Sequence, residues 1–130
     1  MNYMLLKDES PKCDWGILEY DPDKKDFRLF IRRDKKFDVY PILLNETVYK
    51  HNTFVMQPYW ANMWVQERIV PPERQNITSI LRSVGLREYD EFGLLRCSGG
   101  RCPQDKMYLE ELSDKQAEKY AEIYNIRMNQ

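Results

Sequence analysis

The first third of the chain alternates apolar and polar side chains, a pattern typical of β-strands. The clearest stretch, 26–32, reads Asp26, Phe27, Arg28, Leu29, Phe30, Ile31 and Arg32. Because successive strand residues point to opposite faces of a sheet, this stretch predicts one buried face and one mostly solvated face. We expect further strands at 2–7, at 13–20 with Trp15 and Ile17 on one face, and within 47–55.

The spacing of apolar residues changes to a helical period near Pro58. Proline suits the first position of a helix, so a helix is expected from Pro58 to about Arg68. Trp60 and Trp64 are four residues apart and would share one face of that helix. The first 55 residues are therefore expected to be mainly strands, and 58–97 helical.

Two further helices are predicted after the first. One covers 72–84 and ends at Gly85, a residue that readily adopts the left-handed backbone at a helix terminus. Its apolar stripe consists of Ile77, Ile80, Leu81 and Val84. The other is short, is capped by Asp90, and ends at Gly99. A short returning strand is expected at 107–109.

The last predicted helix, 113–128, has the strongest start signal. Ser113 is followed three residues later by Gln116, which is the spacing of a capping box. Its apolar stripe consists of Ala117, Tyr120, Ala121 and Tyr124. Together these elements predict one α+β domain over 1–130, in which a small antiparallel sheet from the N-terminal part packs against three to four helices.

Charge narrows the range of partners. The chain has 20 basic and 21 acidic residues, and a general nucleic-acid ligand is not expected without a clear positive excess. The charges are nevertheless uneven: 24–36 is rich in Lys and Arg, whereas 105–122 is rich in Asp and Glu. This asymmetry is read either as two solvated faces or as a pair of surfaces that steers a partner protein.

The chain opens without a secretory signal and has no apolar run of membrane-spanning length, so a cytoplasmic protein without membrane contact is expected. Its odd number of cysteines fits a reducing compartment. Cys97 and Cys102, with Cys13 and His51, have the donor types of a zinc site. Free thiols are the simpler interpretation, and no metal or cofactor is predicted.

Catalytic signals are weak. His51 is the only histidine, so most catalytic triads and metal sites would lack a base or a ligand. The run Gly99-Gly100-Arg101 could offer backbone N–H groups to an anion, but it lacks the Lys-Ser or Lys-Thr ending of a phosphate-binding loop. We therefore predict a protein that binds another protein or a protein complex and catalyses no reaction.

The candidate partner-binding residues are of two kinds. Trp60 and Trp64 are large hydrophobic residues of the type found at interface hot spots, but they are also ordinary core residues, and at least one of them is expected in the core. The others are arginines: Arg28, Arg32 and Arg33 could steer a partner. Arg74 and Arg101 could bind a carboxylate or phosphate, although a local structural salt bridge is the favoured interpretation of each.

The order of features from Trp64 to Leu112 carries a resemblance that extends to the N-terminal strands. Its residues are the run 64–77, which contains Arg68, Pro71-Pro72 and Arg74, followed by Ile80-Leu81, Gly85-Leu86, 90–95, Gly99-Gly100-Arg101 and Asp105. In this order of features the chain resembles the N-terminal subdomain of HipA-type toxin kinases. The N-terminal strands suit the small sheet of that subdomain. No phosphate loop with a catalytic lysine appears, nor a catalytic-loop Asp with a metal-binding Asn, so the resemblance does not imply kinase activity.

The resemblance implies a stand-alone counterpart of that subdomain. Such a protein would be the small antitoxin or regulatory partner of a HipA-like kinase. An alternative is an inhibitor from a phage or mobile element, similar to an anti-CRISPR protein, that blocks a host defence complex sterically or by charge mimicry. An enzyme with an unrecognised site is a further alternative.

Overall fold

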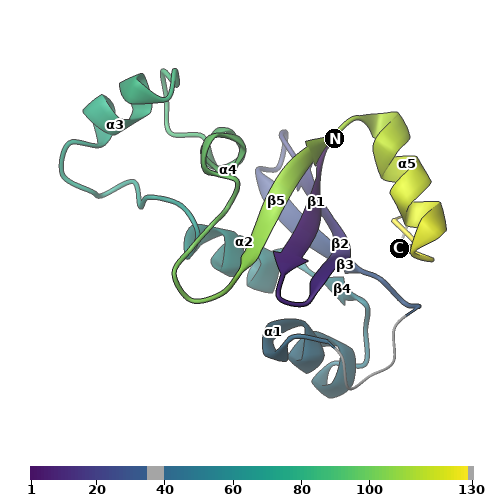
Figure 1. The fold of residues 1–130 in the computed structure, drawn as a ribbon. Helices are drawn as coiled ribbons and strands as arrows, with labels where there is room; N and C mark the ends of the chain where they lie inside the picture. The colour runs from purple at the N-terminus through teal and green to yellow at the C-terminus, as the bar shows by residue number, and fades with distance from the viewer. Residues whose placement is uncertain (35–39, 129–130) are drawn as a thin grey trace.

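The structure, a computed structural model, describes residues 1–34 and 40–128. In this part of the chain, five antiparallel strands form one sheet in the order β4-β3-β2-β1-β5 (Figure 1). The strands are β1 (Asn2–Glu9), β2 (Lys12–Asp21), β3 (Asp26–Ile31), β4 (Val55–Met56) and β5 (Met107–Leu112). The predicted α+β class is confirmed. The returning strand predicted at 107–109 is longer than expected and pairs along β1.

The helices cover both faces of this sheet. They are α1 (Ile42–Asn45), which continues into the π-helix η2 (Glu46–Lys50), then α2 (Pro58–Gln66), α3 (Ile77–Ser83), α4 (Glu91–Ser98) and α5 (Asp114–Ile123). Side chains of α1, η2, α2 and α4 share one buried cluster with the strands, and we call this side of the sheet the α2 face. Helix α5 packs on the opposite side, the α5 face (Figure 1). The strand predicted within 47–55 is limited to Val55, because η2 occupies the start of that stretch.

Neither face of strand β3 is fully solvated, and on its polar side the Arg28 side chain stays partly exposed, at 28%. Phe27, Leu29 and Ile31 belong to the cluster on the α2 face, as their alternation predicts. The alternate positions were expected to be mostly solvated, and that expectation is wrong. Phe30 is buried in the cluster on the α5 face, and Arg32 is only 8% exposed. Helix α5 covers this side, which a single strand cannot reveal.

A β-bulge separates two residues that were predicted to share a face. Gly16 pairs with Leu6, whereas the next pair along β1 joins Lys7 to Asp14, so Trp15 is an extra residue in β2. As a result, Trp15 belongs to the cluster on the α2 face and Ile17 to the cluster on the α5 face. The period of two fails at this point because the bulge adds one residue to β2.

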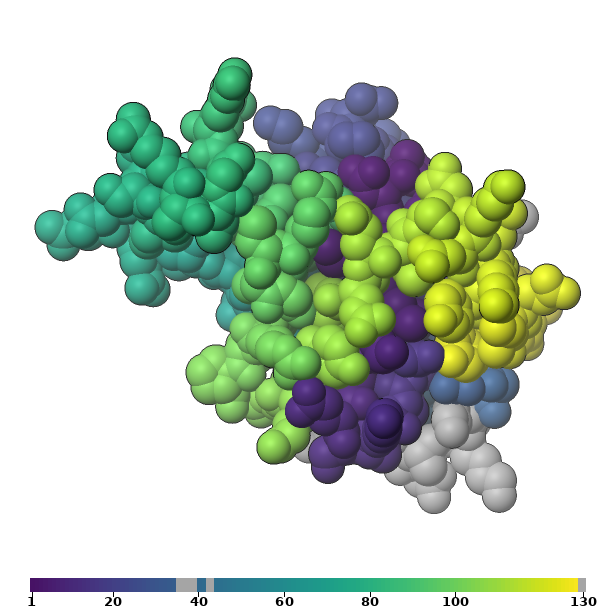
Figure 2. Space-filling view, turned by 45° about the horizontal axis from the view of Figure 1, so that its top comes forward, coloured from purple at the N-terminus to yellow at the C-terminus, as the bar shows by residue number. Residues whose placement is uncertain are grey.

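Helix α3 is shorter and more exposed than predicted. The helix expected over 72–84 begins only at Ile77, because Asn76 has a left-handed backbone with φ 65°. Only Leu81 of its apolar stripe is buried, and Val84 is 38% exposed. Figure 1 shows α3 standing away from the sheet, and Figure 2 shows the same teal segment protruding from the body of the molecule. The predicted end is confirmed: Gly85 has φ 79°, beyond the last turn.

The remaining helix ends follow their sequence signals with two exceptions. In the capping box of α5, the Gln116 N–H donates to Ser113 Oγ over 3.2 Å, and the Ser113 N–H donates to Gln116 Oε1 over 2.9 Å. Helix α5 ends at Ile123 rather than near 128, because Asn125 is left-handed with φ 54°. Asp90 does precede α4, but its side chain makes no capping hydrogen bond.

The bulge in β2 gives a stability prediction. A Cβ atom on Gly16 would lie 2.1 Å from the carbonyl oxygen of Phe30, whereas a Cβ atom on Gly85 would have no atom within 4 Å. We expect Gly16→Ala to lower the free energy of unfolding by more than about 3 kcal/mol, because backbone must move. Gly85→Ala should cost only about 1 kcal/mol, from its left-handed backbone. Urea unfolding measures both, and equal losses would contradict the close strand approach.

Candidate functional site

Helix α2 is held on the sheet by a buried inner side and by one polar anchor. It begins at Pro58, after Gln57 in an extended conformation. The side chain of Asn62 bridges to the start of β3: its Oδ1 accepts from the Phe27 N–H over 2.7 Å, and its Nδ2 donates to Asp26 Oδ1 over 3.0 Å. These two hydrogen bonds fix the rotation of α2, so that one side of the helix is turned to the core and the other to solvent.

The inner side of α2 ends in Trp64, whose ring is held in place by Arg68. Trp64 is 4% exposed, and the guanidinium carbon of Arg68 lies 4.3 Å from the centre of its ring. The Arg68 side chain is itself buried, donates to the Gly100 carbonyl oxygen over 2.8 Å, and forms an ion pair with Asp105. Arg68 therefore ties the end of α2 to the loop before β5 and fixes the position of the Trp64 ring.

The outer side of α2 presents three large apolar residues to solvent, which we call the α2 outer patch. Tyr59 is 70% exposed, Trp60 49% and Met63 45%. The rings of Tyr59 and Trp60 meet edge-on with centroids 4.8 Å apart, and the centroid of the His51 ring lies 6.2 Å from that of Trp60. Apolar side chains gathered on one helix turn are typical of a surface that another molecule covers.

A cavity of about 200 Å³ lies beside this patch, between α2 and the segment that contains η2. We call it the indole cavity. Its lining residues are Glu46, Thr47, His51, Met56, Trp60, Met63, Trp64 and Glu67. Thr47, Met56 and Trp64 are buried, whereas the other five are exposed. The cavity therefore has a floor of one threonine and two apolar side chains, and a rim that includes two carboxylates.

The four lining residues at Trp60, Met63, Trp64 and Glu67 fall at helical positions i, i+3, i+4 and i+7. This stripe was present in the sequence, but only the two tryptophans were singled out from it. The other wall could not be found in the same way, because π-helical spacing gives no strong sequence signal. The structure answers the question that the sequence left open: Trp64 is a core residue and Trp60 is at the surface.

The arginines of the predicted basic stretch 24–36 make contacts within the protein. Arg28 donates to Glu19 Oε1 over 2.7 Å, across the β2–β3 pair. The guanidinium of Arg33 lies 4.9 Å from the ring centre of Phe54. Lys35 and Lys36, the last basic residues of the 24–36 stretch, lie outside the described residues.

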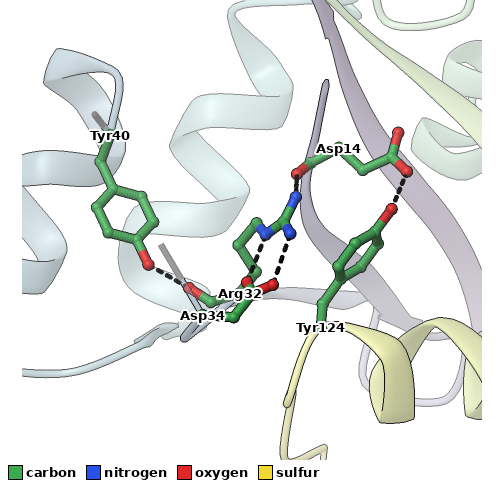
Figure 3. Close-up of polar contacts among 5 residues, drawn as sticks. All are labelled: Asp14, Arg32, Asp34, Tyr40 and Tyr124. Carbon is green, nitrogen blue, oxygen red and sulfur yellow. Dashed lines mark hydrogen bonds and ion pairs between the residues drawn. The ribbon is translucent and has the colours of Figure 1, made fainter. Parts of the chain in front are cut away.

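Arg32 is a buried cross-link between the sheet and the C-terminal helix (Figure 3). It makes two hydrogen bonds to the Asp34 carboxylate, of 2.6 and 2.7 Å, and one of 2.8 Å to the Asp14 carbonyl oxygen. The centre of the Tyr124 ring lies 4.0 Å from the Arg32 guanidinium carbon, and the Tyr124 O–H donates to Asp14 Oδ2 over 2.5 Å. The hydrogen bonds that Arg32 donates to the Asp34 carboxylate raise the pKa of Arg32, so its charge is fixed at all ordinary pH values.

The two other candidate arginines are at the surface. Arg101 forms a 3.0 Å ion pair with Glu9, and its guanidinium carbon lies 4.2 Å from the ring centre of Tyr108. Arg74 is exposed in the turn before α3. Neither contacts the indole cavity, so the structure does not bring all seven predicted binding residues into one site.

The structure does not assemble the zinc ligands considered above. Cys13, Cys97 and Cys102 form no disulfide among the described residues, and His51 lines the indole cavity. Over residues 1–34 and 40–128, no group of three or more His, Cys, Asp or Glu residues is placed to hold a metal ion. No helix in the same ranges is long and apolar enough to cross a membrane.

Comparison of the chain with protein-family models, with curated proteins and with solved structures gives no match. Its function is therefore inferred from its own residues and surfaces.

The two tryptophans of α2 should respond differently to truncation. Trp64→Ala removes a buried ring and should lower the free energy of unfolding by about 3–5 kcal/mol. Trp60→Ala removes a half-exposed ring and should cost less than about 1 kcal/mol. Urea unfolding of both variants measures the difference, and a loss for Trp60→Ala as large as that for Trp64→Ala would place Trp60 in the core.

The Tyr124 contact predicts a pH dependence of stability. Burial, with the hydrogen bond to Asp14, raises the pKa of Tyr124 from 10.0 to about 12. The unfolded chain releases this proton near pH 10 while the native chain keeps it, so the stabilisation is complete below pH 10 and is lost as pH rises through about 12. Denaturant unfolding at several pH values should show that Tyr124→Phe loses less stability than wild type over this range. The exposed-site variant Tyr59→Phe should behave as wild type, and a profile unchanged by Tyr124→Phe would refute the contact.

Proposed function

We propose that the chain is a non-enzymatic protein-binding module and that its partner docks on the α2 outer patch. The observation that carries the proposal is the exposure of Tyr59, Trp60 and Met63 on one helix whose opposite side is packed into the core. Aromatic residues and methionine are enriched at the centres of protein interfaces, and tryptophan and tyrosine supply most hot spots. Neighbouring exposed residues of these three types therefore favour a docking surface.

The way α2 is anchored supports the same proposal. Asn62 fixes the helix to β3, and Arg68 fixes its end to the loop before β5. A patch on a rigid helix has little backbone freedom to lose when a partner binds, so more of the contact energy appears as affinity. The steering role first assigned to Arg28 and Arg32 has less support, because both already form internal ion pairs.

For the partner itself we propose a HipA-like kinase, with this chain as its small regulatory or antitoxin component. This proposal rests on the resemblance carried by the order of features over 64–112. Within that stretch, Trp64, Arg68 and Asp105 make one continuous contact that sets the position of α2. The alternative is that the same patch blocks a host defence complex on behalf of a phage or mobile element.

Site-directed photo-crosslinking tests the docking surface. A photo-reactive amino acid replaces Tyr59 in α2, and in a matched control it replaces Ile123, which is 52% exposed on α5. Expressed in the native host, the Tyr59 probe should capture one protein in high yield, and the Ile123 probe should not. The captured protein is then purified and its affinity for the chain measured directly.

In that measurement, Trp60→Ala should weaken binding by about 2 kcal/mol or more, the scale of a hot spot. The identity of the captured protein separates a kinase from a defence complex. Capture at Ile123 instead of Tyr59, or unchanged affinity for Trp60→Ala, would contradict docking on α2. Substrate turnover that is lost on changing one carboxylate or His51 in a folded chain would show an enzyme instead.

A further inference from the structure

The indole cavity has the size of a side-chain site. At about 200 Å³ it is smaller than the roughly 300–1,000 Å³ of sites that bind drug-sized molecules. It adjoins the α2 outer patch, because Trp60 and Met63 belong to the patch and also line the cavity. A partner lying on that patch would therefore cover the mouth of the cavity and could insert one side chain.

The walls of the cavity suit a group with an apolar stem. Met56, Met63 and two indole rings supply apolar surface. The Trp64 ring is held in place by Arg68 from outside the cavity, so this wall is rigid. Long side chains such as lysine and arginine pack their aliphatic stems on surfaces of this kind while their charged ends stay near water.

The rim of the cavity selects for positive charge. Among the described residues Glu67 has no ion-pair partner, and Glu46 has only an exposed contact of 3.5 Å with Lys50, one turn along the same helix. Such exposed pairs contribute little energy, so the Glu46 carboxylate remains available to another cation. The faces of indole rings also attract cations. An acidic side chain would meet the two carboxylates, and a neutral one would use neither of them.

We propose that the indole cavity receives a lysine or arginine side chain of the partner protein. This inference rests on the proposed function, because it takes the partner to dock on the α2 outer patch. The ammonium or guanidinium group sits at the rim between Glu46 and Glu67, and its stem lies against Trp60 and Met63. The cavity thereby discriminates between partners, because both the length of the inserted stem and the charge at its end must match it.

The test uses n-butylammonium chloride as a probe of the lysine side chain and n-butanol as a neutral probe of equal heavy-atom number. The indole N–H signals of ¹⁵N-labelled protein report binding, because two of the three tryptophans, Trp60 and Trp64, line the cavity and Trp15 does not. We expect saturable shifts of the Trp60 and Trp64 signals with n-butylammonium, at an affinity about 3- to 10-fold above that of n-butanol. The Trp15 signal should not move.

The carboxylates are tested by Glu67→Gln and Glu46→Gln, with Glu122→Gln on α5 as the matched control. Each of the first two should weaken n-butylammonium binding about 3-fold or more at low salt, and the control should leave it unchanged. All three positions are exposed, so the variants should stay folded, as thermal melts can verify. Equal binding of the two probes, no saturable shift, or affinity unchanged by both rim variants would overturn the proposal.

These outcomes are separate from those of the crosslinking experiment. If the Tyr59 probe captures a partner and Trp60→Ala weakens its binding while n-butylammonium gives no shift, docking on α2 holds and the cation site is wrong. If n-butylammonium binds as expected but Trp60→Ala leaves partner affinity unchanged, the cavity binds cations and the protein-docking proposal fails. In an identified complex, changing the inserted lysine or arginine to methionine should reduce affinity about 10-fold or more.

Discussion

The central sheet presents apolar side chains on both faces, and the rest of the fold is arranged to keep both faces from water. Phe27 and Leu29 point to the α2 face, while Ile17 and Phe30 point to the α5 face. Helix α5 covers one side with a narrow stripe around Ala117, held by the Arg32 cross-link. The α2 face is covered by several helices instead. This division leaves α2 with a buried inner side and an outer side that no described element covers.

The residues on the outer side of α2 are thus not needed to stabilise the fold. Ala61 and Val65 are fully buried and Trp64 nearly so, whereas Tyr59, Trp60 and Met63 remain at the surface of the same nine-residue helix. A helix stabilised by its inner side can present any residues on its outer side at little cost to the fold. Large apolar residues there therefore favour a role in binding. The indole cavity adds negatively charged groups to this apolar surface, because its rim carries two carboxylates beside aromatic rings.

Local signals predicted much of this fold from sequence, and contacts between distant residues account for what was missed. The capping box at Ser113, the terminating Gly85 and the alternation in β3 depend on neighbours in the chain, and each led to the right element. The buried state of Arg32 could not be predicted, because it depends on Tyr124 and on the cover that α5 provides. The bulge at Trp15 and the cavity beside η2 likewise depend on contacts between residues that are distant in the sequence. Of the candidate site, the sequence identified the two tryptophans but not which one was buried.

The central claim is that two of the tryptophans build the core while Trp60 is left for a partner. Labelling with 5-fluorotryptophan places one ¹⁹F reporter on each of the three rings. Transfer from H₂O to D₂O should shift the Trp60 signal and leave those of Trp15 and Trp64 nearly unchanged, because both are buried. Addition of the partner captured at Tyr59 should then move the Trp60 signal and abolish its solvent shift. A Trp60 signal that is insensitive to D₂O in the free protein, or to the partner in the complex, would contradict the account.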